Sequence, residues 1–245
     1  MTHSIDLQAM IEFYDENVDA RKHSNAVKTL GHEEFAAALF CHYLKEIEGK
    51  AGTVLDDRSC LPPSGNNGKR LDRWIKVEDA GKLVFYQTEV KAASFHGYSS
   101  GKAIPTDRAA LRLRMSKDFK KCWNAAKGRF LDEGLDKVLQ PMRLDELKGE
   151  GKPDEVRPLA CLWAPLHPNW NVKISSPFFE VSGVKDSEFK SVWVFSASAC
   201  LRQYLHKGIK HLDLKLTKMA ATQDYVDGIY RRHGKMAGNR SEAQV

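Results

Sequence analysis

The hydrophobic and polar positions of this chain follow a helical period in some segments and an extended pattern in others. Apolar residues recur at helical spacing in several segments, and we expect helices at 5–20, 29–48, 107–126, 129–140, 198–208 and 216–234. Short runs rich in β-branched and aromatic residues lie between them and predict strands at 53–55, 71–77, 83–91, 157–166 and 191–197. Helices that alternate with short buried strands are typical of an α/β fold.

The organisation of the chain indicates one domain. Its 245 residues are 42% hydrophobic, which is enough to bury one large core, and neither an internal repeat nor a linker is visible. We therefore predict a single α/β domain over residues 1–245, with its core at about 29–165. Further strands and helices at 166–235 and a frayed tail at 236–245 would complete it.

The strand predicted in "LVFYQTEVKAAS", residues 83–94, carries an acid and a base. Successive side chains of a strand point to opposite faces, so Glu89 and Lys91 share one face while Val90 lies on the other. An isolated Glu-x-Lys is most often a solvated ion pair on a sheet surface. Gln87 shares the face of Glu89, either as a hydrogen-bonding neighbour or as an ordinary exposed residue. A functional site therefore needs support from elsewhere in the chain.

The preceding run, "LDRWIKV", supplies a second carboxylate. Residues 78–81 between the two strands have the composition of a hairpin turn, with a glycine for a positive φ. The resulting register sets Asp72 beside Thr88 and Glu89. Two close carboxylates repel each other unless a cation lies between them, and Mg²⁺ binds through carboxylates, water and substrate phosphate. Lys91 beside them would orient the attacking water or help to deprotonate it.

An aspartate followed, after a hairpin, by Glu-x-Lys resembles the catalytic core of the PD-(D/E)XK nuclease superfamily. The similarity covers the order of elements over about residues 29–165. The segment "GHEEFAAALFCHYL" places Glu34 on the inward stripe of a helix before the hairpin, and a helix and a buried strand follow the hairpin. The chain departs from the motif at Leu71, which stands where many members have proline. The resemblance implies an α/β fold with a restriction-endonuclease-like mixed central β-sheet flanked by helices.

The resemblance also implies a chemistry, the hydrolysis of phosphodiester bonds with Mg²⁺ or, in its place, Mn²⁺. The implied catalytic residues are Asp72, Glu89, Lys91 and Glu34, and the implied metal ligands are Asp72, Glu89 and the carbonyl of Val90. Glu34 would support the site through a water or a second ion. It could equally be a first-turn glutamate favoured by the helix dipole, with Glu33 as its exposed neighbour.

The charge of the chain is compatible with a nucleic-acid partner. The formal net charge is +6, from 38 Lys and Arg residues against 32 Asp and Glu residues, which suits a polyanion without proving one. The residues that we expect to contact DNA are Arg70, Arg73, Arg108, Arg112, Lys117 and Lys121. A basic helix face is most often only solvated, and Arg108 and Arg112 could equally form buried ion pairs.

Other features narrow the class of protein. The five cysteines are scattered singly, which is typical of reduced thiols in a cytoplasmic protein. We expect neither a signal peptide nor a membrane span, and therefore no membrane partner. A glycine-rich phosphate-binding loop is not visible, so we expect no nucleotide cofactor. Ser196 and Ser198 lack the G-x-S-x-G context of a serine hydrolase.

These observations favour a Mg²⁺-dependent DNA endonuclease, such as a restriction or defence enzyme. A homodimer that cuts both strands would suit this activity. The alternative is a non-catalytic nucleic-acid-binding or complex-forming protein that keeps the same fold and uses the basic helix alone. A transferase or another small-molecule enzyme built on "VWVFSASAC" ranks last, because that region lacks a phosphate-binding glycine loop.

Overall fold

The computed structural model describes most of the chain, in several ranges. These are residues 2–16, 32–55, 70–91, 107–164, 166–168 and 176–216. The helix expected at 216–234 falls almost entirely outside them, as does the predicted tail. Within the described ranges, none of the helices combines the length and the apolar character that crossing a membrane requires.

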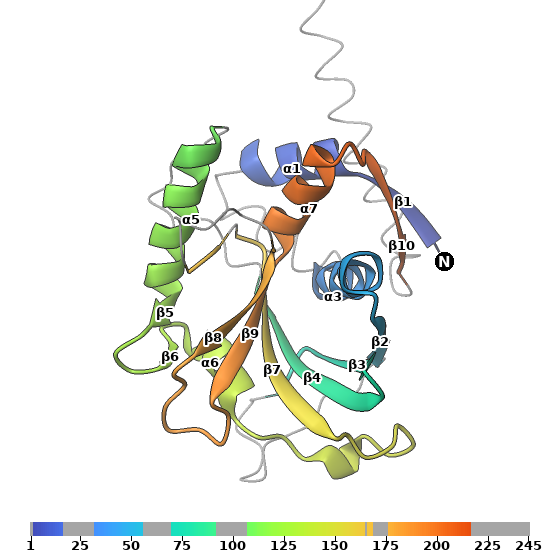
Figure 1. Ribbon diagram of the computed structural model, residues 1–245, viewed down its shortest axis with the longest axis vertical. Coiled ribbons are helices and arrows are strands. Elements are labelled where there is room, and N and C mark those ends of the chain that lie inside the picture. The colour runs from blue at the N-terminus through green and yellow to red at the C-terminus, as the bar shows by residue number, and fades with distance from the viewer. Residues whose placement is uncertain are drawn as a thin grey trace, which may run out of the picture.

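A mixed six-stranded sheet forms the centre of the protein (Figure 1). Its strands, in spatial order, are β2 (Ala51–Leu55), β3 (Arg73–Asp79), β4 (Lys82–Lys91), β7 (Glu155–Leu162), β9 (Ser191–Ser196) and β8 (Phe178–Ser182). β3 is antiparallel to both of its neighbours, β2 and β4; β4, β7 and β9 run parallel, and β8 is antiparallel to β9. The prediction of an α/β protein with a mixed central sheet is confirmed.

Helices pack against both faces of this sheet, and each face has its own apolar cluster. One cluster joins β4 to α3 (His32–Tyr43), to the π-helical turn η1 (Leu44–Glu48) and to α7 (Ala197–His206). The other joins β4 to α5 (Arg108–Cys122), to the short helix α6 (Glu133–Asp136) and to the 3₁₀ turn η2 (Lys137–Leu139). Because both faces are covered, β4 is buried at every position from Val84 to Val90.

The hairpin of β3 and β4 has the predicted register. Arg73 lies opposite Thr88, so that Asp72, one residue earlier, comes next to Glu89. The turn uses Ala80 with a φ of 51° and Gly81 with a φ of 79°. Positive φ values at two successive turn residues match the right-handed twist of the flanking strands. This turn chemistry is what aligns the two carboxylates.

The N-terminal region differs from the expected helix at 5–20. A strand, β1 (Thr2–Asp6), precedes α1 (Leu7–Glu16) and pairs with β10 (His211–Lys215) in a separate two-stranded sheet. The strand β10 was not predicted either, and neither was β8. All three strands are short, and β1 and β10 are made by pairing between opposite ends of the chain, which local periodicity does not reveal.

The region after α5 also differs from the expectation. The helix ends at Cys122 rather than near residue 126, and a small hairpin follows with β5 (Trp123–Asn124) and β6 (Arg129–Phe130). Gly128 adopts a φ of 58°, which the turn requires and which favours glycine. A Cβ at this position would also lie 2.2 Å from the carbonyl oxygen of Gly183, so the two segments can approach each other only because residue 128 has no side chain. The helix expected at 129–140 is therefore replaced by β6, α6 and η2, and the turn η3 (Leu144–Glu146) comes after them.

Candidate active site

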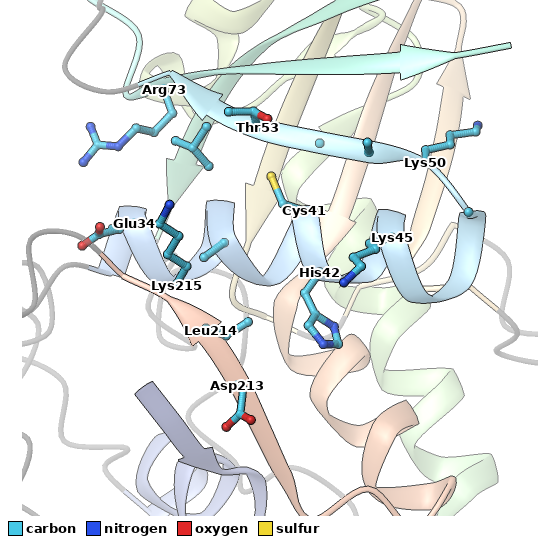
Figure 2. A pocket seen from close by; sticks show the side chains of 15 residues that line it. Glu34, Cys41, His42, Lys45, Lys50, Thr53, Arg73, Asp213, Leu214 and Lys215 are labelled. Carbon is cyan, nitrogen blue, oxygen red and sulfur yellow. The ribbon is translucent and has the colours of Figure 1, made fainter. Parts of the chain in front are cut away.

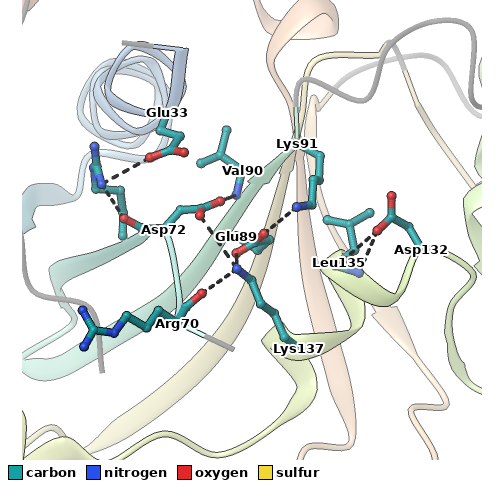
Figure 3. Close-up of polar contacts among 11 residues, drawn as sticks. Glu33, Arg70, Asp72, Glu89, Val90, Lys91, Asp132, Leu135 and Lys137 are labelled. Carbon is teal, nitrogen blue, oxygen red and sulfur yellow. Dashed lines mark hydrogen bonds and ion pairs between the residues drawn. The ribbon is translucent and has the colours of Figure 1, made fainter. Parts of the chain in front are cut away.

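The candidate site lies where β3 begins and β4 ends, and the carboxylates of Asp72 and Glu89 meet there (Figure 3). The Nζ atom of Lys137 lies 2.6 Å from Oε2 of Glu89 and 3.8 Å from Oδ1 of Asp72. One ammonium group thus interacts with both carboxylates. The other oxygen of Asp72, Oδ2, accepts a hydrogen bond from the backbone N–H of Val90 at 2.8 Å. The two carboxylates therefore meet at one ammonium group, as the hairpin register predicted.

Lys91 completes a row of alternating charges. Its Nζ atom lies 2.8 Å from Oε1 of Glu89, so each oxygen of that carboxylate contacts a different lysine. Gly134 of α6 leaves room for this ammonium group, because a Cβ on Gly134 would lie 2.9 Å from it. Burial lowers the pKa of Lys91, but the hydrogen bond and charge of Glu89, with smaller contributions from Asp72 and Asp132, outweigh burial and raise the pKa above its ordinary value. Lys91 is consequently a hydrogen-bond donor at neutral pH.

Glu89 is the most deeply buried group of the site. Its side chain is 0% exposed, whereas 32% of the Lys91 side chain and 14% of the Lys137 side chain remain exposed. Burial, and then the negative charge of Asp72, raise the pKa of the Glu89 carboxyl to about 7, although both lysines act to lower it. The carboxyl therefore changes its protonation state near neutral pH in the metal-free protein.

The first turn of α3 brings Glu33, rather than Glu34, to this cluster. The Glu33 carboxylate pairs with Arg73 at 3.4 Å, and its pKa is raised by burial and then by the negative charge of Asp72. Glu34 is buried, as its place on the inward stripe predicted, but it lines a groove between α3, β2 and β10 (Figure 2). Consecutive helical residues point about 100° apart, so only one of the two can face Asp72.

The oxygen atoms gathered here fit a hard divalent cation. Oδ1 of Asp72 and Oε2 of Glu89 both face the ammonium group of Lys137. The N–H and C=O of one strand residue point to the same side, so the carbonyl of Val90 is directed toward the side of Asp72. In the described part of the chain, no cluster of three or more His, Cys, Asp and Glu side chains is arranged to hold a metal. Mg²⁺ does not need one, because it keeps several waters and is bound through one or two carboxylates.

Gln87 links strand β4 by hydrogen bonds to the segment that carries Lys137. It is completely buried on β4, and its Nε2 donates hydrogen bonds to the carbonyls of Val138 and, at 2.8 Å, of Gln140. Of the two interpretations of Gln87 from the sequence, the structure supports the hydrogen-bonding one. The Gln87 side chain holds η2 against the sheet. It thereby positions Lys137 beside Glu89.

Replacing Gln87 by leucine should loosen η2 without emptying the core. The change conserves volume but leaves the carbonyls of Val138 and Gln140 without their donor, so we expect a loss of about 1–3 kcal/mol in the free energy of unfolding. Denaturant unfolding measures this loss, and hydrogen exchange should show faster exchange around residues 137–140. Thr88→Val is the control, because the Thr88 hydroxyl bonds the carbonyl of Tyr86 on its own strand. Equal exchange in the two variants would contradict the role given to Gln87.

The arginines expected to contact DNA near the hairpin are partly engaged within the site. Arg73 donates to the backbone carbonyl of Asp72 at 2.5 Å and pairs with Glu33. Arg70 is exposed, and its backbone carbonyl accepts a hydrogen bond from Lys137 at 2.5 Å. The side chain of Arg70 is therefore directed to solvent at the rim of the site (Figure 3).

The basic residues of α5 separate into inward and outward groups. Lys117 and Lys121 are exposed, as predicted. Arg114 pairs with the buried Asp118 at 2.7 Å. Arg112 is half-buried, with an Nε atom that has no hydrogen-bond partner among the described residues. The side chain of Arg108 lies outside the described residues.

Lys137 is a site residue that the local sequence patterns did not predict. Its partners, Asp72 and Glu89, lie on other elements far away in the sequence, and the lysine was expected on an ordinary helix. The adjacent Val138 and Leu139 are buried and hold this segment on the sheet. Local spacing carried no signal that would place Lys137 beside Asp72 and Glu89.

Comparisons of the chain with protein-family models, with curated proteins and with solved structures find no match. The class of protein has to be inferred from the mixed α/β fold and from the geometry of Asp72, Glu89, Lys91 and Lys137.

Proposed function

We propose that this protein is a Mg²⁺-dependent DNA endonuclease that hydrolyses phosphodiester bonds, of the restriction or defence kind. The observation that carries the proposal is the approach of the Asp72 and Glu89 carboxylates to one cationic group, with Lys91 bound to the other side of Glu89. Two carboxylates that share a cation at the open end of a hairpin, with a lysine two residues further on, support a metal-assisted phosphodiesterase.

The order of the elements supports the same proposal. A helix, α3, precedes three antiparallel strands, β2 to β4, and α5 then leads to β7, which pairs with β4 in parallel. This is the order that the resemblance to PD-(D/E)XK nucleases implies for the region from 29 to 165. A fold of this kind hosts many activities, and the charged groups of the site distinguish among them.

The residues have separate roles in this proposal. Asp72, Glu89 and the carbonyl of Val90 would hold Mg²⁺, which would polarise the scissile phosphate and lower the pKa of a bound water. Lys91 is protonated, so it orients that water or donates to a phosphate oxygen rather than removing a proton. Glu33 would hold Arg73 in place through its ion pair, and Arg73 in turn donates a hydrogen bond to the backbone carbonyl of Asp72.

Plasmid cleavage tests the proposal directly. We expect nicking or linearisation with Mg²⁺ or Mn²⁺ and none in the presence of a chelator. The substrates should include supercoiled, branched and single-stranded DNA and RNA, because the site does not specify the polymer. A homodimer that cuts both strands would convert plasmid to linear product in one encounter, whereas a monomer would accumulate nicked circles. If none of these substrates is cut, the endonuclease proposal fails.

One observation favours the alternative, a non-catalytic nucleic-acid-binding or complex-forming protein. Both oxygens of Glu89 already have a lysine partner, so the cluster forms a charge network that is complete without a metal. Such a network fixes the position of η2 relative to the hairpin without catalysing a reaction. Binding of DNA that is equally tight with and without Mg²⁺, together with an absence of cleavage, would select this alternative.

Replacing Lys117 and Lys121 by glutamate should weaken binding to all DNA sequences alike. These two exposed lysines of α5 would release counterions from the DNA phosphates on binding. We expect the slope of log affinity against log salt to become shallower by up to about 2 units. Fluorescence anisotropy over a salt series measures it. Lys45→Glu with Lys82→Glu is the control of equal charge; a larger effect of this pair would place the DNA on another face.

A further inference from the structure

Lys137 occupies the position where a divalent cation would have to bind. Its ammonium group lies 2.6 Å from Oε2 of Glu89 and 3.8 Å from Oδ1 of Asp72, so both oxygens face the same cation (Figure 3). A metal ligated by both carboxylates would need the same space, at the shorter oxygen distances of about 2.1 Å that Mg²⁺ requires. The ammonium group and an ion bound to both oxygens cannot occupy this position at the same time.

The position of Lys137 is built into the fold. The segment that carries it is anchored by Gln87 through the carbonyls of Val138 and Gln140. At its other end, Asp132 accepts hydrogen bonds from the N–H groups of Gly134 and Leu135 and caps α6. Lys137 itself donates to the carbonyl of Arg70. This lysine is therefore aimed at the carboxylates by its backbone.

We propose that Lys137 is an internal counterion that holds the cation position in the metal-free protein and moves to a phosphate oxygen of the nucleic acid when a divalent ion enters. The first half of this proposal concerns metal binding alone, and the second half rests on the proposed function. The ammonium group sits on a flexible four-carbon stem, and 14% of the side chain is exposed, so it can turn toward solvent without unfolding η2.

This arrangement couples metal binding to substrate binding. Without a polyanion, an entering ion must displace a positive group from two carboxylates and leave that group beside a second positive charge. With a phosphate present, the displaced ammonium group gains a new anionic partner. Linkage then requires that metal and nucleic acid each strengthen the binding of the other by the same factor. Metal loading would thus be restricted to the protein that already holds its substrate.

The first half is tested by metal titration without DNA. We expect Lys137→Met to bind Mn²⁺ at least about tenfold more tightly than the wild type, because the methionine keeps an unbranched stem but removes the competing charge. Lys137→Arg keeps the charge and should bind Mn²⁺ as weakly as the wild type. Arg129→Met, on the same segment but paired with Asp136, is the matched control. Isothermal titration calorimetry in mildly alkaline buffer measures the affinities, with circular dichroism to confirm folding.

Each outcome of that titration decides the first half. Equal or weaker binding of Mn²⁺ by Lys137→Met than by the wild type overturns it, and so does an equal gain in Arg129→Met. Should Lys137→Met fail to fold, Lys137→Gln takes its place in the same comparison. None of these measurements uses cleavage, so a protein that cuts no DNA would refute the proposed endonuclease and leave this result standing.

The second half is tested by repeating the titration with Ca²⁺ and a DNA duplex under conditions without cleavage. We expect DNA to strengthen Ca²⁺ binding in the wild type and to do so at least about fivefold less in Lys137→Met, whose competing charge is already absent. An equal gain in the two proteins would show that Lys137 does not transfer its charge to the nucleic acid, and would overturn this half alone.

Discussion

Replacing Lys91 by alanine should reduce the rate of DNA cleavage by at least about 100-fold, while affinity for DNA stays close to that of the wild type. The ammonium group contacts Glu89 at 2.8 Å, and 32% of the Lys91 side chain is exposed, so it lies on the solvent side of the site, where the attacking water would lie. Its removal takes away a donor that acts mainly in the transition state, so the loss should appear in kcat rather than in substrate binding. Single-turnover cleavage with saturating Mg²⁺ measures it.

The matched control for this change is Lys76→Ala. Lys76 lies on the neighbouring strand β3 and pairs with Glu150, outside the site, so its loss should leave the cleavage rate within a factor of about two. Thermal unfolding of both variants establishes that the fold is kept. If Lys91→Ala cuts as fast as Lys76→Ala, the role assigned to Lys91 is refuted and the binding protein becomes the better account.

Replacing Glu89 by glutamine should remove a pH dependence from the stability of the metal-free protein. The pKa of the Glu89 carboxyl is raised from 4.5 to about 7 in the folded protein, mainly by burial. The folded state then binds more protons than the unfolded state between these values, so its stability falls as pH rises from about 4.5 to about 7 and falls no further above that. A difference of about 2.5 pKa units corresponds to roughly 3 kcal/mol.

Glutamine stays neutral and carries no such penalty. The stability of Glu89→Gln relative to the wild type should therefore improve with rising pH by up to roughly 3 kcal/mol. Chemical unfolding in chelator at several pH values measures this difference. Glu155→Gln is an informative control, because a hydrogen bond from Arg157 lowers the pKa of Glu155, and its loss should shift the curve in the opposite direction. Parallel stability curves for the wild type and Glu89→Gln would contradict the burial argument.

Local patterns in the sequence were sufficient to predict the hairpin and its three charged residues. Strand side chains alternate with a period of two, and a turn with positive φ at Ala80 and Gly81 sets the register. The relation between Asp72, Glu89 and Lys91 follows from these local rules. The mixed α/β class could be predicted for the same reason, because the periods of helices and strands are visible within short windows.

The burial of these groups was not predictable in the same way. The sequence shows Glu89 among strand residues, but only the packing of α6 and η2 on one sheet face and of α3 on the other makes it completely inaccessible. That burial raises the pKa of the Glu89 carboxyl, so the electrostatic character of the site is a property of the tertiary structure.

The sequence by itself therefore determined the α/β class, the β3–β4 hairpin and the residues Asp72, Glu89 and Lys91 that meet at its open end. Only the tertiary structure decided that Glu33 rather than Glu34 approaches Asp72 and that Lys137 enters between the carboxylates. The physical reason is the range of the interactions. Turn geometry and side-chain alternation act over a few residues, whereas the orientation of a helix and the path of an inserted segment depend on the packing of distant apolar residues on the sheet.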